Sequence, residues 1–168
     1  MHLKTVMSSQ LAAAQSWAYD AVAQPDHSMV GFTGTQDLRR CEWAVIEAII
    51  DNLPADARVV TGGCIGVDAA AAQAAKARGL YVHTVLPAKF EKVDPYWQSW
   101  CDTFEMVPAS KDGHPYRPRN VRLVAWSKVL YVVAAYAEQH PRSIRSGTWM
   151  TARIAKRAGV PIEARVLR

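Results

Sequence analysis

The sequence predicts an α/β three-layer sandwich with a mostly parallel central sheet. Strand-like and helix-like segments alternate along the 168 residues, and glycine-rich turns stand where strands give way to helices. The run KVLYVVAA at 128–135 is apolar on both faces, as a central parallel strand should be. Such alternation is typical of βαβ units. The length fits one domain with a full core.

The first elements follow from hydrophobic spacing. Residues 8–23 predict a short helix with a serine cap. Residues 28–33, SMVGFT, predict the first strand. Residues 38–52 carry apolar side chains at helical spacing, and Pro54 ends that helix. Residues 59–60 form the core of a second, short strand. We therefore divide the chain into an N-terminal helical extension and a main α/β domain, covering 1–27 and 28–168.

The remainder continues the alternation of strands and helices. The expected elements are, in order, a glycine turn at 61–66, a helix at 67–78, a strand at 80–86, a short core-packed helix within 88–104, a strand at 105–107, a helix at 120–126, a strand at 128–135, a helix at 146–158 and a strand at 162–167.

Composition excludes several classes of protein. No window approaches the roughly 18 apolar residues of a membrane span, and the start MHLKTVMSSQ is too polar for a secretory signal. The three cysteines are odd in number and lack CxxC spacing, which argues against a disulfide framework or a zinc site. We expect a cytoplasmic, reducing setting, with no metal and no required cofactor.

The positive charge is concentrated near the C-terminus. Residues 1–110 hold 8 Lys and Arg against 12 Asp and Glu, whereas residues 111–168 hold 12 against 3. The last third therefore indicates an anionic partner, which is a phosphate, a nucleotide or a nucleic acid backbone. The alternative interpretation is a solvated basic face that aids solubility.

Four strand-to-helix turns are expected at one edge of the sheet, because right-handed crossovers place them together at the carboxyl ends of the strands. They are 31–36 (GFTGTQ), 61–66 (TGGCIG), the segment before Arg119 and Asn120, and 145–148 (RSGT). Turns of this kind let backbone N–H groups converge on an anion near a helix N-terminus.

The glycine turn is the densest of these signals. We expect Gly62 and Gly63 to adopt positive φ and to admit a ligand near the backbone, and Gly66 to permit close contact at the helix start. Asp68 is either a helix-capping group or a functional residue that holds a ribose hydroxyl or orients a loop. Neither a Walker motif nor GxGxxG is present. Cys64, inside the turn, is interpreted as a small packing residue.

Together these segments resemble the SLOG superfamily of Rossmann-like proteins, which includes LOG-type phosphoribohydrolases and DNA-processing protein A. The matching pieces are GFTGT, TGGCIGVDAAAAQAA, RPRN, KVLYVVAA and RSGTWMTARIAKRAGVPI, over about residues 28–167. The resemblance implies a Rossmann-like sandwich with one nucleotide-phosphate pocket. Its lining would be Gly34, Thr35, Gly62, Gly63, Gly66, Arg119, Asn120, Ser146, Gly147 and Thr148, with Gln36 and Asp68 at the rim.

One departure from the family pattern bears on catalysis. The phosphoribohydrolases carry PGGxGTxxE, and here Thr151 stands at the position of that glutamate. Glycosidic cleavage needs a carboxylate near the ribose, and Asp68 is the substitute that the sequence offers. We therefore expect a nucleotide-binding module without catalysis, with a LOG-like nucleoside-monophosphate N-glycosidase as the alternative.

A further alternative is single-stranded DNA binding, as in DNA-processing protein A. The segment GHPYRPRN offers Tyr116 and Arg117 for bases and phosphates, and Arg145 flanks the SGT turn. Arg142 is also within reach of a phosphate there. The family resemblance also implies a homodimer or higher homo-oligomer.

Overall fold

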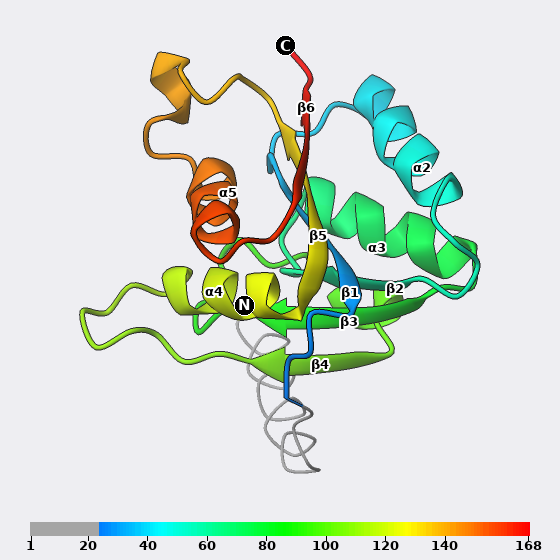
Figure 1. Ribbon diagram of the computed structural model, residues 1–168, viewed down its shortest axis with the longest axis horizontal. Coiled ribbons are helices and arrows are strands. Elements are labelled where there is room, and N and C mark those ends of the chain that lie inside the picture. Colours follow the sequence, from blue (N-terminus) through cyan, green and yellow to red (C-terminus); the bar gives the residue numbers. More distant parts are fainter. Residues whose placement is uncertain (1–23) are drawn as a thin grey trace, which may run out of the picture.

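The computed structural model describes residues 24–168 and contains a six-stranded sheet between two layers of helices (Figure 1). All neighbouring strands are parallel, in the order β4-β3-β2-β1-β5-β6. The strands are β1 (Met29–Gly34), β2 (Arg58–Thr61), β3 (Tyr81–Leu86), β4 (Thr103–Met106), β5 (Ser127–Ala134) and β6 (Ile162–Val166). The α/β sandwich expected from the sequence is confirmed. The helix expected at 8–23 lies outside the described residues.

Two pairs of helices cover the two faces of the sheet, with α2 and α3 on one side and α4 and α5 on the other (Figure 1). The helices are α2 (Trp43–Asp51), α3 (Val67–Ala77), α4 (Arg117–Trp126) and α5 (Gly147–Arg157), with 3-10 helices η1 (Arg40–Glu42), η2 (Trp97–Trp100) and η3 (Pro141–Ser143). The chain runs outward from β1 to β4 and then returns to place β5 on the other side of β1. The gap between β1 and β5 is therefore the topological switch point, where ligands bind in open α/β sheets.

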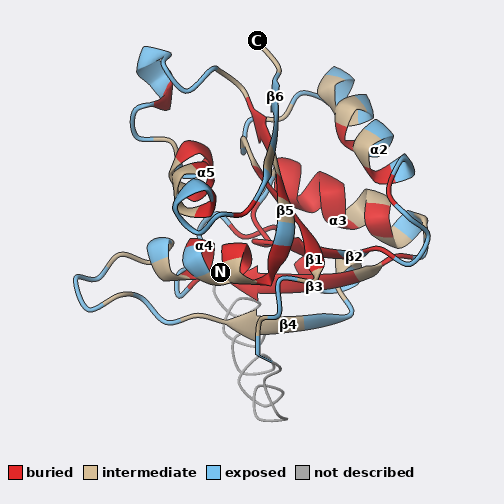
Figure 2. Cartoon of the chain, in the orientation of Figure 1, coloured by how far each residue is buried: buried red, intermediate tan, exposed pale blue. Residues whose placement is uncertain are grey.

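Each helical layer packs on its own hydrophobic core (Figure 2). On one face, Ile46 and Ile50 of α2 meet the alanine-rich side of α3 and strands β1 to β3. On the other face, Leu123 of α4 and Ala155 of α5 pack against Leu130 of β5. Burying both faces explains why β5 is apolar from Val129 to Ala134.

Element boundaries differ from the sequence expectations by up to three residues, and side-chain hydrogen bonds account for two of the differences. The helix expected from residue 38 begins as the 3-10 turn η1, where the Glu42 carboxylate accepts from the Arg39 N–H at 2.8 Å. Helix α4 begins at Arg117 rather than Asn120, because His114 Nδ1 accepts from the N–H groups of Tyr116 and Arg117. Proline is tolerated in this first turn, where its missing N–H costs nothing. Within residues 24–168, no helix has the length and apolarity needed to cross a membrane.

Candidate functional site

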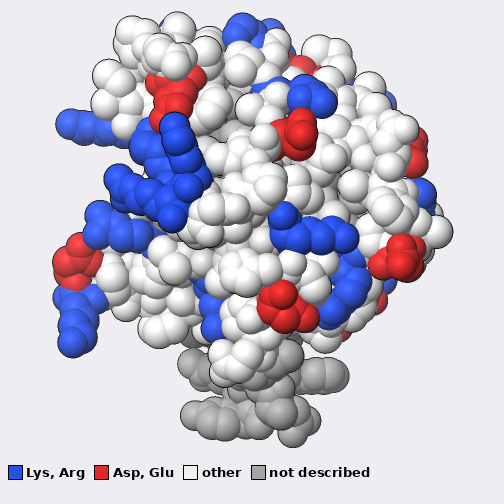
Figure 3. All heavy atoms as spheres, in the orientation of Figure 1, with Lys and Arg blue, Asp and Glu red and all other residues white. Residues whose placement is uncertain are grey.

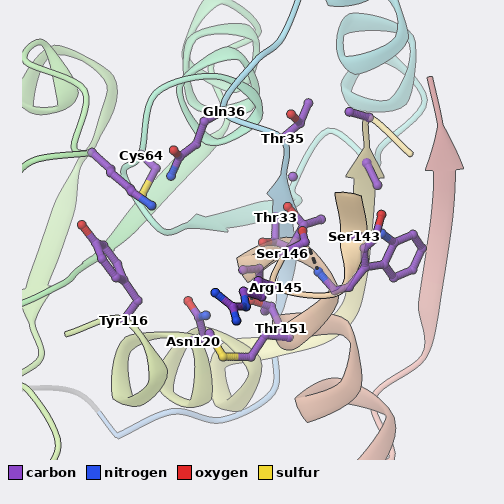
Figure 4. A pocket seen from close by; sticks show the side chains of 18 of the residues that line it. Thr33, Thr35, Gln36, Cys64, Tyr116, Asn120, Ser143, Arg145, Ser146 and Thr151 are labelled. Atoms are coloured by element: carbon purple, nitrogen blue, oxygen red, sulfur yellow. Dashed lines mark hydrogen bonds between the residues drawn. The ribbon is translucent and has the colours of Figure 1, made fainter. Parts of the chain in front are cut away.

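A cavity of about 620 Å³ opens at the switch point between β1 and β5 (Figure 4). All four turns expected at this edge contribute to its walls. The lining residues are Thr33, Gly34, Thr35, Gln36, Asp37, Cys64, Asp68, Lys92, His114, Tyr116, Arg119, Asn120, Ala134, Ala135, Tyr136, Arg142, Ser143, Ile144, Arg145, Ser146, Gly147, Thr148, Trp149, Met150, Thr151 and Arg153.

The N-terminus of α5 forms one wall of the cavity. Ser146 is the N-cap, and its hydroxyl accepts from the Trp149 N–H. In the described part of the chain, the N–H groups of Gly147 and Thr148 donate to no acceptor. A Cβ added at Gly147 would meet nothing within 4 Å, so there is open space beside the first residue of the helix. Free N–H groups and the helix dipole make this wall suited to an anion.

Arg145 adds a positive charge to the same wall. Its exposed side chain points into the cavity, toward the side lined by Asn120 and Tyr116 (Figure 4). Within residues 24–168 it forms no ion pair. Arg142, also in the lining, donates to the Tyr136 hydroxyl at 2.7 Å. Arg145 is therefore the cation of this wall that is available to a ligand.

A buried ion pair forms the floor of the cavity. Arg119 of α4 and Asp68 of α3 are 6% and 4% exposed, with Nη1 3.5 Å from Oδ2. The Asp68 carboxylate also accepts from the Cys64 N–H at 3.2 Å. Burial raises the pKa of Asp68, and the charge of Arg119 opposes that rise. Asp68 therefore joins α3 and α4 and holds the glycine turn, in line with the loop-orienting role that the sequence also offered for it.

The glycine turn is a packing junction beside the cavity. Gly62 does not have positive φ, contrary to expectation; a Cβ there would overlap the Arg119 guanidinium. Gly63 and Gly66 do have positive φ, at 69° and 84°. A Cβ on Gly66 would lie 2.6 Å from Cα of Gln36, which confirms the close contact expected at this helix start. Gly62, Gly63 and Gly66 lie outside the cavity lining.

The N–H groups of this turn are largely used within the protein. Cys64 donates to Asp68, Ile65 to the Lys92 carbonyl at 2.9 Å, and Val67 to the Thr35 carbonyl at 3.0 Å. Donors engaged in this way cannot also cradle a phosphate. Burial beneath Arg119 raises the pKa of the Cys64 thiol to about 11, which agrees with a packing role. The N–H donors in the cavity lining that have no acceptor among the described residues are thus at α5 rather than at Cys64 of the glycine turn.

A loop that carries no motif completes the opposite wall. Residues 87–96 follow β3, and their backbone bridges to the glycine turn, with Asp94 N–H donating to the Gly63 carbonyl. This bridge brings Lys92 to the cavity, 5.4 Å from the ring centroid of Tyr116. Sequence reasoning missed Lys92, because only the fold brings it to the site.

Most of the expected site residues come together. Eleven of them line the cavity: Gly34, Thr35, Gln36, Asp68, Tyr116, Arg119, Asn120, Arg145, Ser146, Gly147 and Thr148. Arg117 does not; it is exposed and pairs with Asp112 at 3.2 Å. Asp37 is a second carboxylate in the lining that the sequence did not single out, and it pairs with Arg168 at 2.9 Å. Among residues 24–168, no cluster of His, Cys, Asp and Glu has the makings of a metal site.

The surface around α5 is strongly basic. Lys and Arg gather over α5 and the segment before it (Figure 3). Arg142, Arg145, Lys156 and Arg157 are exposed there and form no ion pair with the described carboxylates, whereas Arg153 pairs with Glu138. The charge concentration found in the sequence is therefore displayed next to the cavity.

Comparison with known proteins gives matches of structure alone. No protein-family model and no curated protein sequence matches the chain. DNA processing protein A from Streptococcus pneumoniae is 20% identical, with a TM-score of 0.62; the match covers 84% of this chain and 50% of that one. The chain thus spans about half of that protein's length.

Two further solved structures are similar. The molybdenum cofactor binding protein from Rippkaea orientalis is 19% identical, with a TM-score of 0.59 over 86% of this chain and 77% of that one. DNA processing protein A from Helicobacter pylori, whose structure is described for its single-stranded DNA binding mode, is 20% identical, with a TM-score of 0.59 over 84% and 66%. With its six parallel strands and switch-point cavity, the chain has a SLOG-type fold.

Proposed function

We propose that this protein binds a nucleotide or a nucleotide-derived ligand in the switch-point cavity, without catalysing a reaction on it. The observation that carries the proposal is the α5 wall, where two unengaged N–H groups at Gly147 and Thr148 stand beside the unpaired Arg145. A phosphate satisfies all three, since N–H donors at a helix N-terminus and a guanidinium are its preferred partners. Asn120, nine-tenths buried in the lining, offers an amide to the rest of the ligand.

The carboxylates in the cavity favour binding over hydrolysis. Asp68 is buried against Arg119, and Asp37 is bonded to Arg168. At the position of the family glutamate, the Thr151 hydroxyl donates to the Gly147 carbonyl at 2.9 Å. An N-glycosidase needs a carboxylate free to support the ribose during cleavage. Free base released from any nucleoside monophosphate would contradict the non-catalytic proposal. If Asp37→Asn then abolished the release of base, Asp37 would be the carboxylate that supports cleavage.

The first experiment is mass spectrometry of small molecules released by acid from natively purified protein. A nucleotide in near-stoichiometric amount would support the proposal and give the ligand class. Titration calorimetry should then compare Arg145→Ala with Arg157→Ala, an exposed arginine at the far end of α5. Losing a charge-assisted hydrogen bond costs about 1.5–3 kcal/mol, so Arg145→Ala should raise Kd by roughly 10- to 100-fold. Equal affinities in the two variants would rule out the α5 wall.

Single-stranded DNA is the second candidate ligand, favoured by the basic surface around α5 (Figure 3). Each phosphate neutralised on a single strand contributes about −0.7 to the slope of log K against log salt. An oligonucleotide that contacts Arg142, Lys156 and Arg157 as well as Arg145 should therefore bind with a slope steeper than about −2. A flat salt response would leave the cavity ligand as the sole proposal. The homo-oligomer implied by the family resemblance stays a prediction, to be tested by light scattering.

A further inference from the structure

The wall of the cavity opposite α5 is also positively charged. It consists of Lys92, His114, Tyr116 and Arg119, which gather around the N-terminus of α4. In Figure 4, Tyr116 lies across the cavity from Ser143 and the α5 turn. Two sets of polar and cationic side chains, one at α5 and one beside α4, therefore face one cavity.

Lys92 is fixed at its backbone and free at its ammonium group. Its carbonyl accepts from the Ile65 N–H, which holds the loop on the glycine turn. Its Nζ lies 5.4 Å from the centroid of the Tyr116 ring, a cation–π arrangement that keeps the charge at the cavity. Among the described residues no carboxylate pairs with it.

Two neighbouring groups strengthen this wall as an anion site. His114 Nδ1 accepts from the N–H groups of Tyr116 and Arg117, so the neutral ring carries its proton on Nε2, as a donor. The Arg119 side chain is more than nine-tenths buried, yet its Nε has no hydrogen-bond partner, and its Nη1 is 3.5 Å from Asp68. A buried guanidinium with an unfilled donor and a long contact to its carboxylate is undersatisfied.

We propose that the ligand carries two separate anionic groups, one bound at the N-terminus of α5 with Arg145 and the other bound by Lys92 and the Nε2–H of His114, beside Arg119. This inference rests on the proposed function and narrows its ligand to a nucleotide with two phosphates that are not adjacent. Such a ligand is a nucleoside bisphosphate, or two successive nucleotides of a phosphorylated strand.

The experiment compares ligands with one and two separated phosphates by calorimetry. The four nucleoside 5′-monophosphates are titrated first, and the base that binds best is carried forward. Its 3′,5′-bisphosphate and its 5′-phosphorylated dinucleotide are then measured with wild type, Lys92→Ala and Lys89→Ala. Lys89 is the matched control, since it is exposed on the same loop and lies outside the cavity lining.

We expect at least one two-phosphate ligand to bind about tenfold more tightly than the monophosphate, the size of one charge-assisted hydrogen bond. Lys92→Ala should weaken binding of the two-phosphate ligand about tenfold more than it weakens binding of the monophosphate, with Lys89→Ala like wild type. Whichever of the 3′,5′-bisphosphate and the 5′-phosphorylated dinucleotide binds more tightly then shows whether the ligand is a nucleoside bisphosphate or a nucleic acid strand.

Equal affinity for one and two phosphates would overturn the inference and leave the proposed function standing. An equal loss for both ligands in Lys92→Ala would also overturn it, because a single phosphate would then contact both walls. Absence of binding by every ligand would remove the proposed function as well.

Discussion

Replacing Gly62 with alanine tests the buried floor of the cavity. The added Cβ would overlap Nη1 of Arg119 and lie 2.5 Å from its Cζ and 2.7 Å from Oδ2 of Asp68. Non-bonded heavy atoms without strain are about 3.5–4.0 Å apart, so the overlapping end of the guanidinium has to move by roughly 2 Å. It is buried and paired with Asp68, so that movement breaks a contact that water cannot replace.

The expected loss of stability follows from these contacts. Overpacking a core costs about 1–3 kcal/mol, and breaking a buried ion pair costs about 3–5 kcal/mol. Because the guanidinium can shift while keeping part of its interaction, we expect Gly62→Ala to lower the free energy of unfolding by about 3 kcal/mol. Urea unfolding followed by tryptophan fluorescence measures this directly.

The control is the same Gly62→Ala substitution in a variant in which the buried ion pair has been replaced by uncharged residues. In the double variant Asp68→Asn/Arg119→Met, a flexible methionine can move aside, and no buried charge is left unpaired. Since Gly62 does not have positive φ and the overlapping guanidinium is gone, alanine there should cost well under about 3 kcal/mol, the remainder being its close contact with the side chain at position 68. A loss of about 3 kcal/mol in both backgrounds would refute the reasoning, because the cost would then come from elsewhere.

Three other predictions follow from the same structure. Gly147→Ala should change stability by less than about 0.5 kcal/mol yet weaken nucleotide binding, because its methyl group meets no protein atom and enters the cavity; calorimetry and urea unfolding separate the two effects. Burial acts to raise the pKa of Glu105, but hydrogen bonds from His83, Trp126 and Arg122 outweigh it and hold that pKa below 4.5. This stabilisation is therefore present above about pH 4.5 and lost as pH falls through the folded pKa, so the urea midpoint should drop in acid, and less so in Glu105→Gln. Iodoacetamide at pH 8 should label exposed Cys41 well before Cys64, whose thiol pKa is about 11; equal labelling in the native protein would contradict the burial of that turn.

The fold could be predicted because its signals are local. Alternating elements, the two-sided apolar run of β5 and glycine at strand-to-helix turns each constrain a few neighbouring residues. The ends of helices and strands were harder to predict wherever a single side-chain hydrogen bond determines where the element begins. His114 draws α4 back to Arg117 through two hydrogen bonds, and the residues from 114 to 117 contain no sequence pattern for such a cap.

The site was predicted only in part, because its chemistry depends on which donors stay free. Gly62 and Gly63 have the composition of a phosphate cradle, but the turn they belong to donates its N–H groups within the protein. Gly147 sits in a less conspicuous motif and has open space before it. Lys92 lies outside every motif and reaches the cavity through a backbone bridge between two loops. Hydrogen-bond satisfaction and loop pairing are properties of the folded chain, and a list of residues does not contain them.

The walls of the cavity come from both sides of the topological switch point between β1 and β5. A ligand bound there would therefore connect the two sides of the sheet. One side of the cavity comes from the segments after β1 and β3 and from the start of α4, and the other follows β5 and begins α5. A ligand that contacts both sides would oppose their separation. At a concentration about 100 times Kd it contributes about 2.7 kcal/mol to the stability of the whole sheet. Ligand concentration would then set the lifetime of the folded chain as well as the occupancy of its cavity.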